Sequence, residues 1–163
     1  YLRLEILEVV HVNEWVARDF DRAFNILEES YFPLAGPEVN NGGRLPGPFM
    51  YILLAVPLLF NESYESIFIF NLFLNIGSIV GFYFILKRFF NIYFACIATS
   101  LLSLNIFHIG AVGFPINPSF LFPFIVLFLW FLLEFLLNKK DNFFLFSILI
   151  ICLSIQLHLY PVN

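Results

Sequence analysis

Charged side chains are scarce in this sequence and unevenly placed. Only 12% of the 163 residues are Asp, Glu, Lys or Arg, whereas about a quarter is usual in soluble domains. Eight of the twelve acids lie within residues 1–38, and the 98 residues from Ser66 onward carry six charges. Hydrophobic residues make up 61%, and the mean hydropathy is +0.89. A soluble domain of this length cannot bury so much apolar surface, so we predict an integral membrane protein.

Cysteine, histidine and basic clusters are also rare, which argues against several kinds of function. Cys96 and Cys152 both lie in apolar runs, so neither a disulfide framework nor a zinc-ligand spacing is visible. Three histidines without clustered carboxylates make no metal signature, and we predict no cofactor, with a divalent metal left open. No basic stripe indicates nucleic acid. Because the chain begins at Tyr1 rather than Met and ends without a closing element, we expect a piece of a longer protein.

Long apolar runs predict membrane-spanning helices, since roughly 20 apolar residues are needed to cross about 30 Å of hydrocarbon. Four runs meet or nearly meet this length: residues 66–86, 92–109, 119–137 and 143–160. Residues 1–10 would be the end of an earlier span. The predicted fold class is all-α, a polytopic transmembrane helical bundle with interfacial helices in the first outer loop, residues 11–60.

The apolar run at residues 48–60 is too short for an ordinary span. As a helix its thirteen residues reach about 20 Å, and Pro57 would kink it. If this run does not span, Lys87–Arg88 and Lys139–Lys140 lie on one side, which the positive-inside rule makes cytoplasmic, and the acidic loop lies on the other. If it spans, the acidic loop joins the basic side, and the rule alone does not exclude this. Length and Pro57 favour a re-entrant or interfacial helix.

With that choice, three polar regions are predicted to lie outside together: Val10–Gly47, Gly110–Pro118 and Leu157–Asn163. Several amide and imidazole side chains stand near these outer ends and are candidates to line a site: Asn105, His108, Asn117, Gln156, His158 and Tyr160. Deeper in the first clear span, Asn71, Asn75 and Ser78 share a face beside Gly77-x-x-x-Gly81. We interpret that face as a helix-packing surface.

Residues 13–30 of the outer loop predict an amphipathic helix. Apolar residues recur at spacings of three and four: Val16, Phe20, Ala23, Phe24 and Leu27. Asp19 and Asp21 flank this stripe, where a carboxylate that approaches the membrane needs a partner. These acids are candidate functional groups, or alternatively solvated or ion-paired with Arg18 and Arg22.

The segment 33–48 predicts an irregular loop, because four Gly and four Pro occur within sixteen residues. Gly42–Gly43 permit close approach of the backbone to a ligand. Arg44 is the cation of this loop, and a guanidinium binds phosphate with two hydrogen bonds. An ordinary contact with a lipid headgroup or a backbone carbonyl is an equal alternative.

Four stretches together resemble a known superfamily: Arg18-Asp19 followed by Ile26-Leu27; Pro33-Leu34-Ala35-Gly36-Pro37 with Gly42-Gly43; Pro46-Gly47-Pro48-Phe49-Met50-Tyr51; and Asn117-Pro118 followed by Gln156-Leu157-His158. Their order and spacing resemble the GT-C superfamily of membrane glycosyltransferases, including the protein O-mannosyltransferase-like and aminoarabinose-transferase-like families. The likeness is greatest to bacterial members described as dolichyl-phosphate-mannose-protein mannosyltransferase-like. It covers nearly all of residues 1–163, which would be the N-terminal part of a GT-C-type transmembrane domain.

The resemblance implies an activity at the outer face of a bacterial cytoplasmic membrane. A sugar would pass from a polyprenyl-phosphate donor to a hydroxyl of a lipid, glycan or protein, usually with inversion. A carboxylate in the first outer loop acts as base in this superfamily. The family often begins that helix with Asp-Glu, whereas this chain has Asn13-Glu14 and then Trp15. Asp19 is therefore our predicted base, with Asp21 or Glu14 as the runner-up.

The remaining site predictions concern substrate binding. Arg44 would hold the lipid phosphate, because a cation favours a phosphate leaving group. Arg18, Asn117, Gln156 and His158 would line the cavity for the donor and acceptor.

Two other functions would suit a membrane protein of this composition. A transporter would have a polar path through the membrane, often at broken helices in repeated halves, but the sequence has no evident internal repeat. A non-catalytic membrane subunit would not require an acidic helix beside a Gly-rich loop. Glycosyl transfer is favoured over both mainly by the resemblance.

Overall fold

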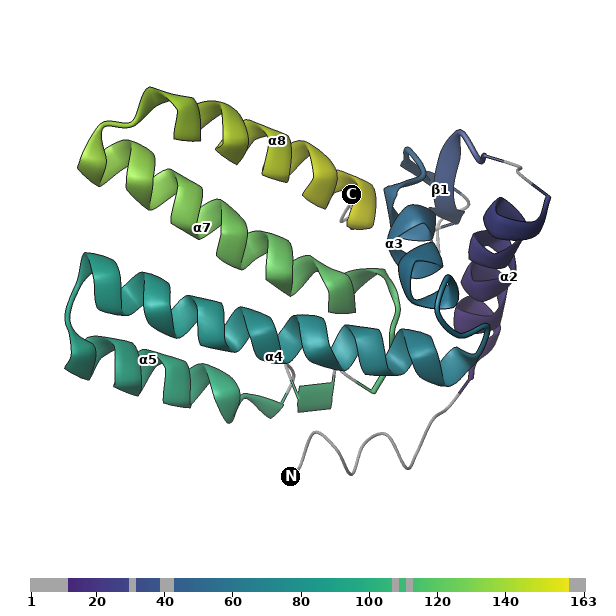
Figure 1. Cartoon of the computed structure of the whole chain (residues 1–163), viewed down its shortest axis with the longest axis horizontal. Coiled ribbons are helices and arrows are strands. Elements are labelled where there is room, and N and C mark those ends of the chain that lie inside the picture. Colours follow the sequence, from purple (N-terminus) through teal and green to yellow (C-terminus); the bar gives the residue numbers. More distant parts are fainter. Residues whose placement is uncertain (1–11, 30–31, 39–42, 107–108, 111–112, 159–163) are drawn as a thin grey trace.

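A computed structural model describes residues 12–29, 32–38, 43–106, 109–110 and 113–158 (Figure 1). The structure is 77% helical and nearly all-α, in agreement with the predicted class. Its elements in chain order are α2 (Glu14–Glu28), β1 (Ala35–Glu38), β2 (Arg44–Pro46), α3 (Phe49–Leu58), α4 (Tyr64–Phe89), α5 (Ile92–Ser103), η2 (Asn117–Phe120), α7 (Leu121–Asn138) and α8 (Asp141–Leu157). The predicted span end at residues 1–10 lies outside these ranges.

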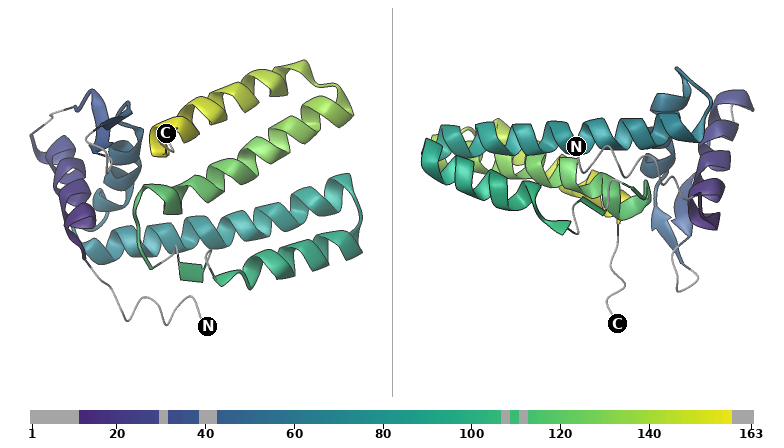
Figure 2. Two further views of the ribbon diagram at one scale, coloured as in Figure 1. Left: turned by 180° about the vertical axis from the view of Figure 1, so that it is seen from behind. Right: turned by 90° about the horizontal axis from the view of Figure 1, so that it is seen from below.

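The four longer helices lie side by side in the order α5, α4, α7, α8 (Figures 1 and 2). The α4–α5 and α7–α8 turns are at one end of this layer, and α2, α3 and the two strands are at the other. Within the described ranges, two helical stretches are long and apolar enough to cross a membrane, namely α4 and residues Asn117–Asn138, which join η2 to α7. The helices α3, α5 and α8 are apolar but shorter.

The two basic pairs of the sequence lie at the same end of the layer, as predicted. Arg88 Nη2 lies 2.5 Å from Glu134 Oε1, and Lys140 Nζ lies 3.0 Å from Glu134 Oε2. Asn138 also donates a hydrogen bond to Glu134 Oε2 at 2.9 Å. Because the Glu134 side chain is almost fully buried, these partners supply the contacts that an acid in an apolar helix needs. The cluster joins α4 to the α7–α8 turn.

The prediction of one helix over residues 92–109 is wrong, because α5 ends at Ser103 after twelve residues. The last turn tightens: the Leu104 N–H approaches both Ser100 O and Leu102 O, and the Asn105 N–H donates to Leu102 O. Ser103 Oγ donates to Ser100 O as well. Serine and asparagine offer the backbone hydrogen bonds that compete with a continuing helix. At about 18 Å, α5 is shorter than a bilayer core.

The helix predicted over residues 13–30 is present as α2. Asn13 caps it, since Asn13 Oδ1 accepts a hydrogen bond from the Val16 N–H at 2.9 Å. The stripe packs on α3 and α4 rather than facing outward: Val16 and Ala23 are buried, and Phe20, Phe24 and Leu27 are partly buried. Asp19 is buried with them, while Asp21 is exposed.

The irregular loop predicted over residues 33–48 contains a short antiparallel ribbon instead. Ala35 pairs with Pro46 and Glu38 pairs with Arg44, with an irregular register between these pairs. Leu45 is 1% exposed and anchors the ribbon. An opposite-charge pair across two strands stabilises them. The Gly and Pro content correctly predicted turns but concealed these few strand residues.

The helix α3 occupies the apolar run at residues 48–60 and reaches about 15 Å. It ends one residue after Pro57, which lacks the N–H of a helix interior. Its buried residues join α2, α4, η2 and α8 in one hydrophobic cluster: Ala23, Met50, Leu54, Ala55, Leu58, Ile67, Phe120 and Leu157. This cluster fixes α2 against the end of the helical layer.

The polar face of α4 behaves as a packing surface only in part. Asn71, Asn75 and Ser78 are buried, and Asn75 Nδ2 donates to Asn71 Oδ1 and to Ser119 O of η2 at 2.9 and 3.3 Å. Gly77 departs from the prediction, because a Cβ added there would meet no atom within 4 Å. The amides therefore join α4 to η2, whereas Gly77 faces open space.

Candidate functional site

Asp19 is the buried carboxylate at the end of the bundle formed by α2, α3 and the ribbon. Only 2% of the residue is exposed. The Arg18 guanidinium binds it through Nε and Nη2, both to Oδ1, at 2.8 and 2.7 Å. Both contacts fall on Oδ1, so this ion pair does not involve Oδ2. The ion pair that the sequence offered as an alternative is thus present.

Burial has a larger effect on the pKa of Asp19 than the nearby cation Arg18 does. Removal from water raises the pKa of Asp19 from 3.8 to about 6, although the hydrogen bond and charge of Arg18 lower it. The Glu38 carboxylate adds a smaller upward contribution to this pKa. A carboxyl group with such a pKa is ionised at pH 7 and is a stronger base than an ordinary aspartate.

Arg18 is held by three groups at once. Besides Asp19, its Nη1 donates a hydrogen bond to the backbone oxygen of Glu38 at 3.4 Å. Its guanidinium also lies 4.8 Å from the centre of the Trp15 ring, within range of a cation–π contact. The same side chain therefore orients Asp19 and connects α2 to strand β1.

Arg44 lies on the ribbon beside this group. Its Nη2 lies 2.7 Å from Glu38 Oε1, and both side chains are more than half exposed. The Arg44 contact is the main reason that the pKa of Glu38 is lowered. An exposed ion pair contributes little stability, so a phosphate can compete with Glu38 for the guanidinium.

Tyr51 also lies near Asp19, although no separate role was predicted for it. It is 5% exposed on α3, and burial, followed by the negative charge of Asp19, raises its pKa. Arg18, Arg22 and Arg44 act on Tyr51 in the opposite direction. Its position three residues before Leu54 and four before Ala55 marks the buried face of α3, which was a usable signal in the sequence.

The C-terminal end of α8 contacts the ribbon at Gly47. A Cβ added at Gly47 would overlap the side-chain amide of Gln156. His158 follows directly as the C-cap of α8 and is partly buried. Asn117, partly buried, begins η2, which contacts both α4 and α8. The structure thus gathers Arg18, Asp19, Arg44, Asn117, Gln156 and His158 at one end of the fold.

The other predicted acids and loop residues are placed differently. Glu14 and Asp21 are exposed on α2, so neither shares the burial of Asp19. Gly42, His108 and Tyr160 lie outside the part of the chain that the structure describes. Within that part, no three or more His, Cys, Asp and Glu side chains gather to hold a metal ion.

Comparison with known proteins found no matching family model, no matching curated protein and no matching solved structure. Arg18, Asp19, Arg44 and Tyr51 are called the end group below, and their chemistry is therefore inferred from their own geometry. The end group combines a buried carboxylate of raised pKa, a guanidinium that orients it, a second guanidinium in an exposed pair, and a phenol nearby. Such a group can accept a proton and bind an anion at adjacent positions.

Proposed function

We propose that this chain is part of an integral membrane glycosyltransferase of the GT-C type. It transfers a sugar from a polyprenyl-phosphate donor to a hydroxyl of a lipid, glycan or protein. The reaction takes place at the outer face of a bacterial cytoplasmic membrane. The observation that carries this proposal is the buried Asp19, which has a raised pKa and lies at one polar end of an apolar helical layer.

The exterior of the helical layer supports a membrane location. Large apolar side chains are widely exposed on α4, α5 and α8, for instance Phe73 at 68%, Tyr93 at 80% and Leu145 at 67%. Soluble monomers rarely expose apolar patches of this extent. In a bilayer the same side chains face lipid, and the basic pairs at the α4–α5 and α7–α8 turns face the cytoplasm.

The proposed reaction uses Asp19 as general base. The acceptor hydroxyl gives its proton to Asp19 Oδ2 as its oxygen bonds to the anomeric carbon of the sugar. The bond from that carbon to the phosphate oxygen breaks, and polyprenyl phosphate leaves with the bonding electrons. Arg44 exchanges Glu38 for the phosphate and stabilises the charge that develops there. Arg18 keeps Asp19 oriented, and we assign Tyr51, Gln156, His158 and Asn117, which lie at the same end of the fold, to substrate binding.

The proposal predicts release of polyprenyl phosphate. Membranes that contain the protein are incubated with a panel of polyprenyl-phosphate hexoses and pentoses and with an acceptor-containing membrane extract. We expect at least one donor to release polyprenyl phosphate faster than in membranes without the protein. If no donor does so, and the protein takes up labelled solutes when it is placed in proteoliposomes, the results favour a transporter instead.

The raised pKa of Asp19 predicts the acid limb of the pH profile. The base works only when ionised, so kcat/KM should be constant above a pH of about 6 and fall about tenfold per unit below it. An aspartate with the ordinary pKa of 3.8 would place this bend near pH 3.8. Initial rates between pH 4.5 and 8 distinguish the two. A profile that stays flat down to pH 5 would contradict the assignment of Asp19.

A further inference from the structure

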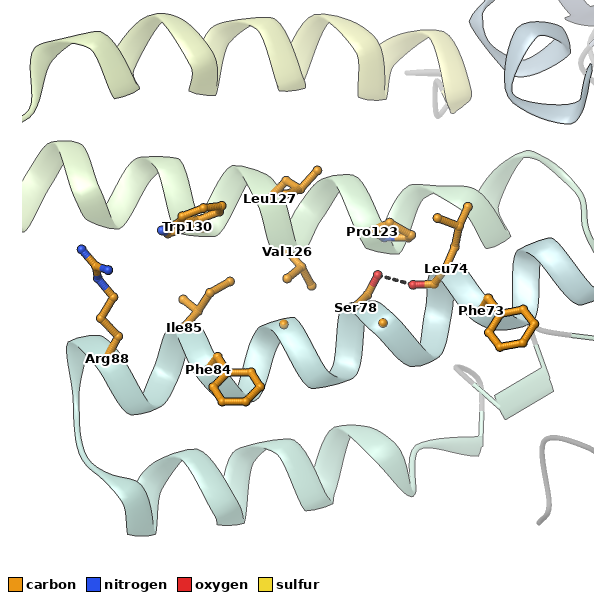
Figure 3. Close-up of a pocket in the computed structure, with 12 residues that line it drawn as sticks. Phe73, Leu74, Ser78, Phe84, Ile85, Arg88, Pro123, Val126, Leu127 and Trp130 are labelled. Carbon is orange, nitrogen blue, oxygen red and sulfur yellow. Dashed lines mark hydrogen bonds between the residues drawn. The ribbon is translucent and has the colours of Figure 1, made fainter. Parts of the chain in front are cut away.

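A groove of about 530 Å³ lies between α4 and α7 (Figure 3). Its walls are almost entirely apolar: Phe73, Leu74, Phe84, Val126, Leu127 and Trp130. Ser78 donates its hydroxyl to Leu74 O at 2.5 Å, so this polar group is satisfied within α4. Such a groove binds water poorly, because a bound water molecule needs several polar partners.

The groove is open where α4 has glycines. A Cβ at Gly77 would meet nothing within 4 Å, and one at Gly81 would meet only Val126, at 3.8 Å. From Phe73 to Arg88 the groove follows α4 for about 22 Å. One leaflet of the hydrocarbon core is about 15 Å thick, so an extended acyl chain fits along this path.

One end of the groove is basic. Arg88 lines that end (Figure 3), and its side chain is 54% exposed despite the contact with Glu134. The adjacent turns carry four cations against two acids, a net charge of +2: Lys87, Arg88, Lys139 and Lys140 with Glu134 and Asp141. A guanidinium binds phosphate oxygens while retaining a carboxylate partner, because it has five N–H donors.

We propose that this groove binds one acyl chain of an anionic glycerophospholipid whose phosphate lies at Arg88. Basic clusters at the cytoplasmic end of spans attract anionic headgroups, and the apolar walls take the chain. This inference rests on the membrane location in the proposed function but not on sugar transfer. The site lies at the opposite end of α4 from Asp19, so it is separate from the proposed donor site.

The test measures quenching of Trp130 fluorescence in detergent by phospholipids with brominated acyl chains. Bromine quenches tryptophan fluorescence only at close range. The part of the quenching that is lost in Trp130→Phe therefore reports lipid in the groove. For wild type we expect saturable quenching by brominated phosphatidylglycerol, with at least tenfold weaker quenching by brominated phosphatidylcholine. Equal quenching by both lipids would overturn the role of Arg88 and the anionic headgroup.

A matched pair of glycine variants tests the groove itself. Gly77→Leu fills the groove and should weaken phosphatidylglycerol binding at least tenfold. Gly110→Leu should bind like wild type, because Gly110 also has open space around its Cβ position and does not line the groove. Unchanged lipid binding in Gly77→Leu would overturn the proposal. If Gly77→Leu instead dissociates a dimer, a second copy of the chain fills the groove, and the proposal is overturned as well. Lipid binding without any sugar transfer would leave this inference intact and refute the proposed function.

Discussion

Replacing Asp19 with Asn should reduce sugar transfer by about two to four orders of magnitude. The amide keeps the size of the side chain but cannot take the proton of the acceptor hydroxyl. Asp19 is the appropriate acid because it is buried and its pKa is raised to about 6. The measurement is the initial rate of polyprenyl phosphate release for wild type and Asp19→Asn at pH 7.5.

The folded state should tolerate Asp19→Asn, so the lost rate can be attributed to chemistry. The folded-state pKa of Asp19 lies above the ordinary aspartate pKa of 3.8, so above pH 6 the buried carboxylate destabilises the fold. This penalty is relieved as the pH falls from 6 toward 4 and the carboxylate binds a proton. An uncharged amide removes the penalty, while Arg18 retains its contact with Glu38 O. We expect the variant to melt in detergent at or above the wild-type temperature at pH 7.5.

The exposed acids of α2 provide the comparison for this result. Asp21→Asn and Glu14→Gln change the same type of group on the same helix, but both acids are exposed. Asp19→Asn with wild-type transfer would contradict the assignment of the base. If Asp21→Asn or Glu14→Gln lost transfer instead, the runner-up would hold that role.

The sequence predicted the parts of the fold that depend on periodicity and length. The stripe Val16–Leu27 marked the buried face of α2, and the apolar runs marked α4 and α7. Asp19 lies three residues after Val16 and four before Ala23, but the sequence alone placed Asp19 and Asp21 alike beside the stripe and did not single out Asp19 as buried. The spacing did not reveal that burial would affect the pKa of Asp19 more than the charge of Arg18 does, because that balance depends on how α3 covers α2.

Features that depend on particular hydrogen bonds and contacts were not predictable in this way. At the early end of α5 the Ser103 hydroxyl donates to Ser100 O and the Asn105 N–H donates to Leu102 O, whereas hydropathy alone favoured a longer helix. The ribbon depends on the backbone pairing of Ala35 with Pro46 and of Glu38 with Arg44, and on the burial of Leu45. Gly77 looked like a packing residue, yet whether a small residue meets a neighbouring helix depends on how α4 and α7 cross.

Replacing Gly47 with Ala should disturb the residues around it, because Gly47 has a special backbone conformation and a close neighbour. Its φ is +81°, in the left-handed region that residues with a Cβ rarely adopt. An alanine Cβ would also overlap the Gln156 side chain. Backbone strain of about 1–2 kcal/mol should lower the melting temperature of Gly47→Ala clearly, and the displacement of the Gln156 side chain adds to this loss. Thermal unfolding in detergent, followed by size-exclusion chromatography, measures this.

A second substitution separates the two causes. Adding Gln156→Ala to Gly47→Ala removes the overlap but leaves the backbone strain, so it should recover only part of the lost stability. Gly77→Ala is the matched control: its Cβ meets open space, and Ala favours a helix interior over Gly by about 1 kcal/mol. If Gly47→Ala melts like wild type, the ribbon does not need its left-handed turn. If the double variant recovers fully, the overlap with Gln156 alone is responsible, and contact between α8 and the ribbon determines where His158 and Arg44 stand.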